Sequence, residues 1–197
     1  YVNNVQTTSV VIPDTVTQIK SSAFYNYDNL TSITIPNSVT KIGVNAFDSC
    51  GALKTVNLGS GITSIGSGAF YYCSALTGVY ITDIDKWFNI SFGSNTANPL
   101  YYAKNLYENG EKVTSVTVPS TVSQINAYLF NGATCLTSVT IPALVSSIGT
   151  DAFSGCNGLT GVYIYDLEKW CITDFGSLYA NPLYNAHNLY LNNVLVT

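Results

Sequence analysis

Two short acidic clusters, each next to a tryptophan, have the residue types and spacing that come nearest to catalytic chemistry in this sequence. Residues 78–90 read "GVYITDIDKWFNI", and residues 161–173 read "GVYIYDLEKWCIT". Two carboxylates two positions apart could serve as a general acid and a general base, but only inside a cleft that shifts the pKa of one of them. The charged residues of the two clusters are Asp83, Asp85, Lys86, Asp166, Glu168 and Lys169.

Both clusters stand where a short helix is expected to begin, just before Trp87 and Trp170. An acid at a helix N-terminus caps free backbone N–H groups and complements the helix dipole. We therefore interpret the acids as helix caps, with calcium binding and catalysis as the alternatives. Trp87 and Trp170 are interpreted as core residues of a widened coil, with exposed stacking on a sugar as the alternative.

Five cysteines and one histidine are the remaining candidates for nucleophilic or metal chemistry. The odd number of cysteines and the lack of a Cys-x-x-Cys pair argue against a disulfide framework and a zinc site. Cys50, Cys73 and Cys156 share one repeat position and are expected to be buried, inert thiols, although Cys50 and Cys73 stack closely enough for a disulfide. His187 aligns with Lys104 in the other copy of its segment and is interpreted as a surface residue. We predict no catalytic residue, no metal ligand, no cofactor and no enzyme activity.

The composition argues against several classes of partner. Charged residues make up 9 % of the 197-residue chain, all seven basic residues are lysine, and the net charge is −4. Phosphate recognition favours arginine forks on a basic face, so nucleic acid and anionic membrane surfaces are not expected partners. No apolar run reaches the roughly 18–20 residues of a membrane span, so membrane insertion is not expected. The sequence contains no methionine, from which we expect a segment of a longer precursor.

A 23-residue repeat sets the positions of these residues. Residues 32–54 read "SITIPNSVTKIGVNAFDSCGALK", residues 138–160 read "SVTIPALVSSIGTDAFSGCNGLT", and the same frame fits 9–31, 55–77 and 115–137. Apolar residues recur at frame positions 2, 4, 8, 11, 16 and 22. Positions 1 to 5 alternate between polar and apolar residues, which predicts a half-buried strand. The Ala-Phe pair near position 16 suits one helical or 3₁₀ turn.

Two variant coils, 78–114 and 161–197, interrupt the standard repeats. As a result, a block of two standard coils and one variant coil recurs after 83 residues, with the first block at 32–114 and the second at 115–197. Residues 1–8 resemble the end of a variant coil and are predicted to be the tail of a preceding one. Each variant coil is expected to contain a small hairpin, because Asn-Gly and Asn-Asn tolerate positive φ between β-prone residues. The expected turns are Asn109-Gly110, Asn192-Asn193 and, in the tail, Asn3-Asn4.

A strand and a turn in every unit predict a single solenoid over 1–197, of the α/β class but mostly β. One unit cannot bury its apolar residues alone, whereas stacked units can. Strands of adjacent coils lie about 4.8 Å apart, so the seven coils predict one parallel sheet roughly 30 Å long. In this arrangement Ile33, Val56 and Val79 should share one interior column.

The frame "S[IV]TIPxxVTxIGxxAFxxCxxLT", with the interspersed "KW…NPLYxAxNLYxNG" unit, resembles the BspA-like leucine-rich-repeat family over nearly the whole chain. The resemblance implies a curved, right-handed solenoid with a parallel concave sheet. It also implies a surface or secreted protein of the kind common in anaerobic, often gut-dwelling, bacteria and in some mucosal protists. Members of the family are linked with adhesion and host-component binding, and the family has no shared catalytic residues.

The concave sheet is the expected binding surface. Standard coils present serine and threonine there, whereas the variant coils present Tyr80 and Thr82, and Tyr163 and Tyr165. Tyrosine offers a rigid apolar ring and a hydroxyl, which suit protein or glycan binding. These four residues are the predicted ligand-binding site. The alternative is that tyrosine is simply favoured on exposed strands.

The sequence therefore predicts an extracellular or cell-surface recognition and adhesion module that binds a host or extracellular protein or glycan, and that is a monomer. A passive spacer within a longer surface protein is the alternative. A third possibility is ice or crystal binding by regular threonine rows, which the interrupting tyrosines and the expected curvature disfavour.

Overall fold

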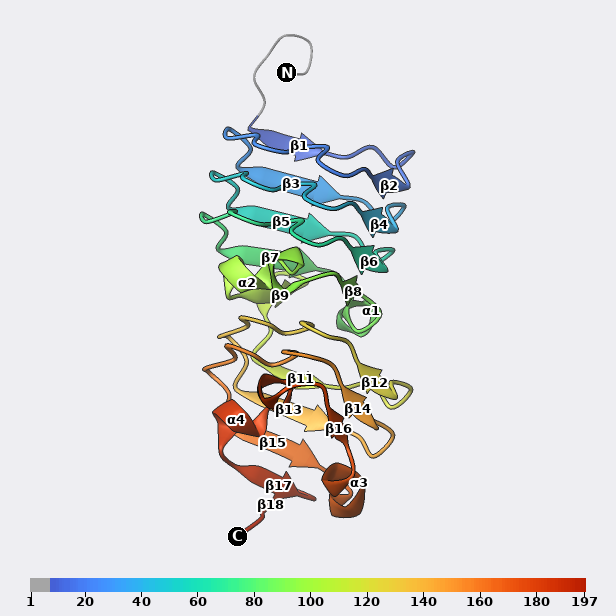
Figure 1. The fold of residues 1–197 in the computed structure, drawn as a ribbon, viewed down its shortest axis with the longest axis vertical. Helices are drawn as coiled ribbons and strands as arrows, with labels where there is room; N and C mark the ends of the chain where they lie inside the picture. Colours follow the sequence, from blue (N-terminus) through green and yellow to red (C-terminus); the bar gives the residue numbers. More distant parts are fainter. Residues whose placement is uncertain (1–7) are drawn as a thin grey trace.

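Equivalent strands of successive repeats lie side by side and build an elongated solenoid (Figure 1). The computed structural model describes residues 8–197. Ile33 pairs with Val56, Val56 pairs with Val79, and all three side chains are fully buried. The interior column predicted from the repeat is therefore confirmed, and so is the mostly β solenoid of the α/β class.

The main face of the solenoid carries two sheets, not the single seven-stranded sheet predicted from the sequence. Their strands are β1 (Ser9–Val11), β3 (Ser32–Ile35), β5 (Thr55–Leu58), β7 (Gly78–Ile81), β9 (Leu106–Glu108), β10 (Glu111–Lys112), β11 (Ser115–Thr117), β13 (Ser138–Ile141), β15 (Gly161–Ile164), β17 (Leu189–Leu191) and β18 (Val194–Leu195). The first sheet has the order β1-β3-β5-β7-β9-β10, and the second has the order β11-β13-β15-β17-β18.

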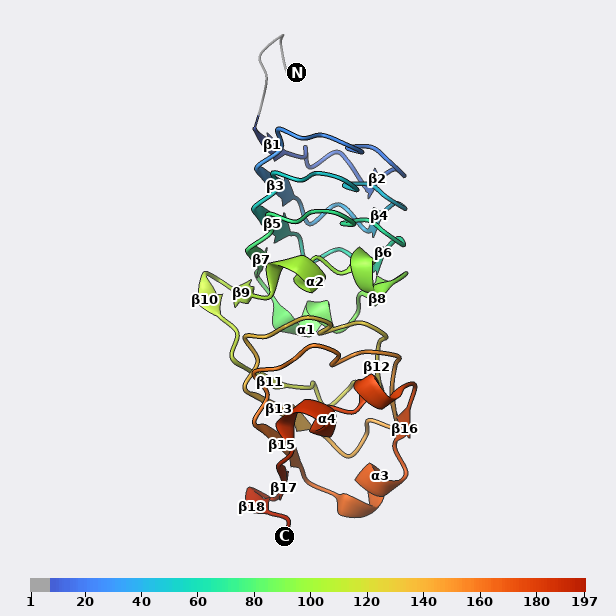
Figure 2. The ribbon, with the colours of Figure 1, turned by 60° about the vertical axis from the view of Figure 1, so that its left-hand side comes forward.

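The hairpin of the first variant coil causes this break. Strand β9 pairs in parallel with β7, and β10 turns back along the free edge of β9 and projects from the solenoid (Figure 2). Because β10 occupies that edge, β11 cannot extend the ladder and instead starts the second sheet. The prediction of one continuous sheet was wrong because it counted one sheet strand per coil and did not foresee that the first strand of the predicted hairpin, β9, joins the main sheet beside β7.

The two hairpin turns have the predicted residues. Asn109 and Gly110 adopt positive φ angles of 50° and 88°, and Asn192 and Asn193 adopt 50° and 66°. Both pairs connect antiparallel strands, β9 to β10 and β17 to β18. The hairpins predicted at these two places are confirmed. The third predicted turn, at Asn3-Asn4, and the predicted tail up to residue 7 lie outside the described residues.

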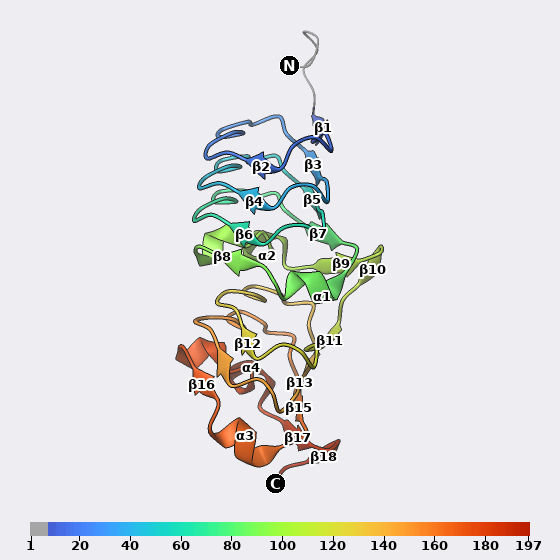
Figure 3. The same cartoon turned by 90° about the vertical axis from the view of Figure 1, so that its right-hand side faces the viewer.

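A second face of each coil carries a smaller sheet that the sequence analysis did not predict (Figure 3). Its parallel strands are only two residues long: β2 (Gln18–Ile19), β4 (Lys41–Ile42), β6 (Ser64–Ile65) and β8 (Ser91–Phe92) in the first half, and β12 (Gln124–Ile125), β14 (Ser147–Ile148) and β16 (Asp174–Phe175) in the second. The isoleucine at frame position 11 points into the core from these strands, for example Ile42 and Ile65. Two residues are too short to show an alternating pattern.

The third face consists of turns in the standard coils and of short helices in the variant coils. In the second coil, Ala46 N–H donates to the carbonyl of Gly43 (3.3 Å), and Cys50 N–H donates to Phe47 (3.2 Å), as in a 3₁₀ turn. The phenylalanines at frame position 16 stack behind these turns. On this face the variant coils have the 3₁₀ helices η1 (Asn95–Ala97) and η2 (Leu178–Ala180) and the helices α2 (Leu100–Ala103) and α4 (Leu183–Ala186). The other two helices, α1 (Ile84–Trp87) and α3 (Leu167–Cys171), instead connect the main strand of each variant coil to its strand in the smaller sheet, β7 to β8 and β15 to β16.

Side-chain hydrogen bonds join the two halves where strand pairing stops. The amide of Asn98 donates to the backbone carbonyls of Tyr128 (2.7 Å) and Leu129 (3.0 Å). The amide of Asn126 donates in the opposite direction, to the carbonyl of Ile90 (3.0 Å). The junction between the two main sheets is therefore held by specific amide groups and by the continuous core.

Candidate functional site

The acidic clusters cap helices. One carboxylate oxygen of Asp83 accepts hydrogen bonds from the backbone N–H groups of Asp85 (3.0 Å) and Lys86 (3.2 Å) at the start of α1. Asp166 accepts one from Lys169 N–H (3.0 Å) at the start of α3. The capping interpretation is confirmed for both aspartates. Within residues 8–197, no group of three or more His, Cys, Asp and Glu side chains could hold a metal ion.

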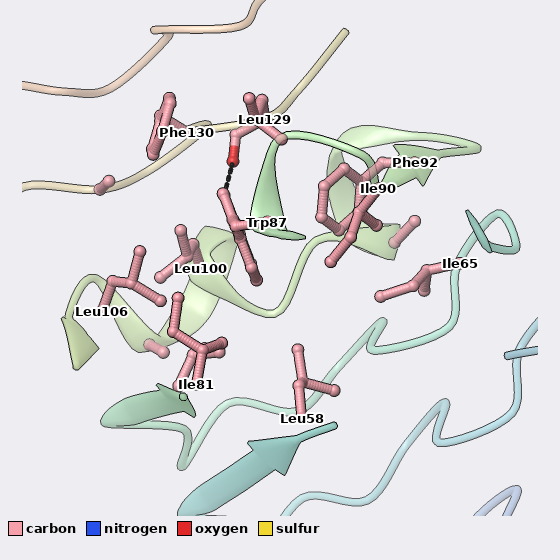
Figure 4. Packing of buried hydrophobic residues seen from close by; sticks show 14 of the residues in the cluster. Leu58, Ile65, Ile81, Trp87, Ile90, Phe92, Leu100, Leu106, Leu129 and Phe130 are labelled. Carbon is pink, nitrogen blue, oxygen red and sulfur yellow. Dashed lines mark hydrogen bonds between the residues drawn. The ribbon is translucent and has the colours of Figure 1, made fainter. Parts of the chain in front are cut away.

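Both tryptophans belong to the core, as predicted. Trp87 is 1 % exposed, and its indole N–H donates to the carbonyl of Leu129 (3.1 Å) across the junction (Figure 4). Its ring also contacts Phe92 at a centroid distance of 5.6 Å. Trp170 is also buried and packs edge-on against Phe175 at 5.3 Å. Neither indole therefore presents an open face on which a sugar could stack.

The three cysteines at frame position 19 are buried and free, as expected. The thiol of Cys50 donates to the carbonyl of Phe24 (3.1 Å), and those of Cys73 and Cys156 make equivalent bonds. Burial raises the pKa of the Cys50 thiol to about 11, and it also raises the pKa of the Cys73 and Cys156 thiols. These thiols are therefore poor nucleophiles, since reactivity requires the thiolate.

Two other groups with possible chemistry lie at the surface of α3 and α4. Cys171 is exposed, unlike the cysteines at frame position 19. His187 is exposed and ends α4 in a left-handed conformation with φ 60°, as Lys104 ends α2 with φ 62°. The two aligned residues therefore occupy the same helix-ending position in their coils, which gives His187 a structural role.

The tyrosines of the main face are packed in pairs. Tyr80 on β7 stacks on Tyr107 of β9 with ring centroids 4.7 Å apart, and Tyr163 stacks on Tyr190 at 4.6 Å. The rings of Tyr80 and Tyr163 each lie over the glycine two residues earlier in the chain. A Cβ atom on Gly78, for example, would lie 2.9 Å from the ring of Tyr80. This contact explains why the variant coils begin with glycine where standard coils have serine or threonine.

The packing leaves the edges of these rings for a ligand. On the neighbouring strands Tyr80 has Asn57 on one side and Tyr107 on the other, and the ammonium of Lys112 lies 5.8 Å from the ring centroid of Tyr107. Tyr80 is consequently half-buried. It presents its ring edge and hydroxyl, which favours hydrogen bonding over ring-to-ring stacking.

A groove of about 710 Å³ crosses the carboxyl ends of β1, β3, β5 and β7. Its lining includes Asn57 and Tyr80 on the strands, Asp14 and Thr82 beyond the strand ends, and Asn109 at the hairpin tip. The amide of Asn109 donates to the carbonyl of Thr82 (3.3 Å), which fixes the hairpin tip beside the groove. The lining contains one acid and no basic residue, which suits neutral or cationic groups of a ligand.

The structure brings two of the four predicted site residues into this groove and leaves two outside it. Tyr80 and Thr82 line the groove, whereas Tyr163 and Tyr165 lie on the second sheet, where Tyr165 is 56 % exposed. The sequence analysis missed the contribution of Asn109. Its Asn-Gly signal was used to predict a turn, but only the folded chain shows that the turn lies beside β7.

Comparison with known proteins identifies the repeat. The chain matches the family model described as "BspA type Leucine rich repeat region", in six copies over residues 1–99 and 100–181. No curated protein matches the chain. In the part of the chain that the structure describes, no helix is long and apolar enough to cross a membrane.

Several solved structures are similar to this chain. A leucine-rich repeat protein of T. pallidum is 22 % identical with a TM-score of 0.51, and the match covers 91 % of this chain and 80 % of that one. A leucine-rich cell surface protein of Faecalibacterium prausnitzii is 24 % identical with a TM-score of 0.40, over 86 % of this chain. The match covers only 35 % of that protein. A leucine-rich repeat protein of Bacteroides ovatus is 23 % identical with a TM-score of 0.47, and the match covers 80 % of this chain and only 42 % of that one. The T. pallidum structure supports the solenoid fold.

Proposed function

The chain belongs to the BspA-type leucine-rich-repeat family, and from that premise we propose that it is a recognition module that binds a host or extracellular protein or glycan through the groove of its main face. The groove is the observation that carries the proposal. It spans four coils, so a ligand would contact side chains from repeats far apart in the sequence. Concave surfaces built in this way are the usual binding sites of solenoid proteins.

The proposed mode of action is non-enzymatic. One acid of each pair that resembled a catalytic pair, Asp83 and Asp166, is a helix cap, and the buried cysteines have raised pKa values. What remains in the groove are hydroxyl, amide and carboxylate groups that donate and accept hydrogen bonds. We place the module at the cell surface or outside the cell, as the family resemblance implies, and we expect it to act as a monomer.

A binding screen with a matched pair of variants tests this proposal. The probes are an array of glycans and a panel of immobilised extracellular-matrix proteins. Thr82→Arg places a long charged side chain at the groove, and Tyr165→Arg places the same side chain at the equivalent position of the second block, where both native residues are exposed. We expect Thr82→Arg to weaken binding about tenfold or more, which corresponds to 1.4 kcal/mol or more. Tyr165→Arg should have no effect.

Two outcomes would overturn the proposal. If the captured ligand binds Thr82→Arg as tightly as the native chain, the groove is not the site. If no glycan or matrix protein binds the native chain, the passive spacer becomes the better account. Circular dichroism of both variants checks that the repeat fold is unchanged.

A further inference from the structure

Four tyrosines form a cluster on the turn face of the first block, away from the strands that carry the groove. Tyr71 and Tyr72 belong to the turn after β6, and Tyr101 and Tyr102 belong to α2 in the next coil (Figure 2). The rings of Tyr71 and Tyr72 lie 4.0 Å apart, and those of Tyr101 and Tyr102 lie 5.0 Å apart. We call these four residues the tyrosine cluster.

Tyr72 has a backbone conformation that disfavours its own side chain. Its φ angle is 54°, in the left-handed region, where a bulky residue is an outlier. The same frame position is left-handed in every standard coil, and the other coils place small or turn-forming residues there: Asn26, Ser49, Gly132 and Gly155. A tyrosine at this position costs conformational free energy that those residues avoid.

Burial does not offset this cost, because Tyr72 is 58 % exposed and Tyr71 is 38 % exposed. The left-handed backbone instead brings the two neighbouring rings together. The hydroxyl of Tyr102 accepts a hydrogen bond from the backbone N–H of Tyr72 (3.1 Å), which holds this conformation. A hydrogen bond between the side chains of Tyr71 and Tyr72 raises the pKa of Tyr71. The chain therefore fixes two rings at the surface in one arrangement.

The second block shows that the fold does not need these rings. The residues equivalent to Tyr71 and Tyr72 are Ser154 and Gly155, and the turn there has the same left-handed position, with φ 72°. The residue equivalent to Tyr102 is Asn185, whose amide donates to the carbonyl of Phe153 (3.1 Å). A serine and a glycine thus build the same turn, so the tyrosines of the first block are explained by a ligand better than by packing.

The size and chemistry of the cluster favour a saccharide. Aromatic rings stack on the C–H faces of sugars, and phenolic hydroxyls donate and accept hydrogen bonds. The rings of Tyr71 and Tyr72 pack against each other, with centroids 4.0 Å apart and 38° between their planes, so the pair offers an outer ring surface the size of one sugar ring, whereas a stable protein interface needs about 800 Å² on each partner. Nearby, the ammonium of Lys104 lies 5.3 Å from the ring centroid of Tyr101, and the carboxylate of Asp48 is buried and accepts from the Ser49 hydroxyl (2.9 Å).

We propose that the tyrosine cluster is a carbohydrate-binding site, separate from the groove, in which Tyr71 and Tyr72 contact the sugar and Tyr102 positions them. The site belongs to the first block alone, because Ser154 and Gly155 replace the two contact residues in the second.

The test uses the residues of the second block as substitutions. Wild-type protein is applied to a glycan array, and each bound oligosaccharide is titrated in free form by calorimetry. The double variant Tyr71→Ser with Tyr72→Gly should lose at least tenfold in affinity while its melting temperature stays the same or rises, since glycine relieves the left-handed position. Tyr25→Ser, which removes a 56 % exposed tyrosine at the frame position of Tyr71 in the first coil, is the control and should bind normally.

Thr82→Arg separates this site from the groove, because it should leave binding to the cluster unchanged. Three results would overturn the proposal: no oligosaccharide on the array binds the wild-type chain, the double variant binds as tightly as the wild type, or its melting temperature falls markedly. The last result would show that the two rings stabilise the fold.

Discussion

At the residue scale, many of the polar groups that could do chemistry already make hydrogen bonds that stabilise the repeat. Asp83 and Asp166 cap helices, Trp87 fills the core and donates its indole N–H, and the buried cysteines donate to carbonyls of the preceding coil. Side chains without such a task are the candidates for contact with a ligand, and some of them lie at positions where the two blocks differ. Tyr71 and Tyr72 are the clearest examples, since the other block has serine and glycine there.

The buried thiols predict a pH dependence of stability. Their pKa values in the folded chain are raised by burial above the ordinary 9.0, to about 11 for Cys50. Between these two pH values the unfolded chain loses thiol protons that the folded chain keeps, so the free energy of unfolding should fall as the pH rises. The raised pKa of Tyr71 and of Tyr102 acts in the same direction, and the lowered pKa of Lys104 acts in the opposite one.

Urea denaturation at neutral pH and at pH values inside this window checks the prediction. A variant with alanine at Cys50, Cys73 and Cys156 should lose less stability over the same window. A stability that is independent of pH, or that rises, would contradict it.

At the element scale, the pattern of the sequence predicts strands and turns well when a local signal is sufficient. The alternation in Ser32–Ile35 and the Asn109-Gly110 pair each gave the correct element. The small sheet was missed because strands such as Lys41–Ile42 are too short to alternate. The groove and the tyrosine cluster could not be predicted, because both depend on contacts such as Tyr72 to Tyr102, 30 residues apart.

Capping of α1 provides a prediction at this scale. Asp83→Ala removes two hydrogen bonds from the N-terminus of the helix and should lower the free energy of unfolding by about 1 kcal/mol. Asp166→Ala removes one such bond from α3 and should cost less. Chemical denaturation of the two variants side by side gives the comparison. Equal stability of Asp83→Ala and the native chain would show that the cap contributes nothing.

At the scale of the whole molecule, each half of the solenoid has one main sheet and one small sheet, and the two halves share one continuous core. Side-chain bonds such as those of Asn98 and Trp87 cross the junction between the two main sheets, together with a backbone bond from Cys135 N–H to the carbonyl of Lys104 (3.4 Å) and the packing of rings such as Phe88 on Phe130. In a repeat protein, overall cooperativity depends on the interfaces between neighbouring units. The junction should therefore control whether the two halves unfold together.

Asn98→Ala tests this control. The change removes both amide bonds to Tyr128 and Leu129 and leaves the Leu129 carbonyl with the indole of Trp87 alone, which should cost about 1–3 kcal/mol. It should also separate thermal unfolding into two transitions. Asn181→Ala is the matched control. Both asparagines accept a bond from the first residue of their own helix, Leu100 or Leu183, but of the two only Asn98 is shown to donate to another coil. A single transition in Asn98→Ala, with unchanged stability, would show that the core alone couples the halves.

The interrupted sheet also has a mechanical consequence. If the chain is pulled along its long axis, the load passes through whole ladders of backbone hydrogen bonds in each half. At the seam between the two main sheets it passes through the connecting chain, a few amide and indole groups and the backbone bond from Cys135 to Lys104. We expect this seam to open first under tension, while each half keeps its own rungs, so that the molecule would lengthen in a discrete step and recover its shape when the force is released.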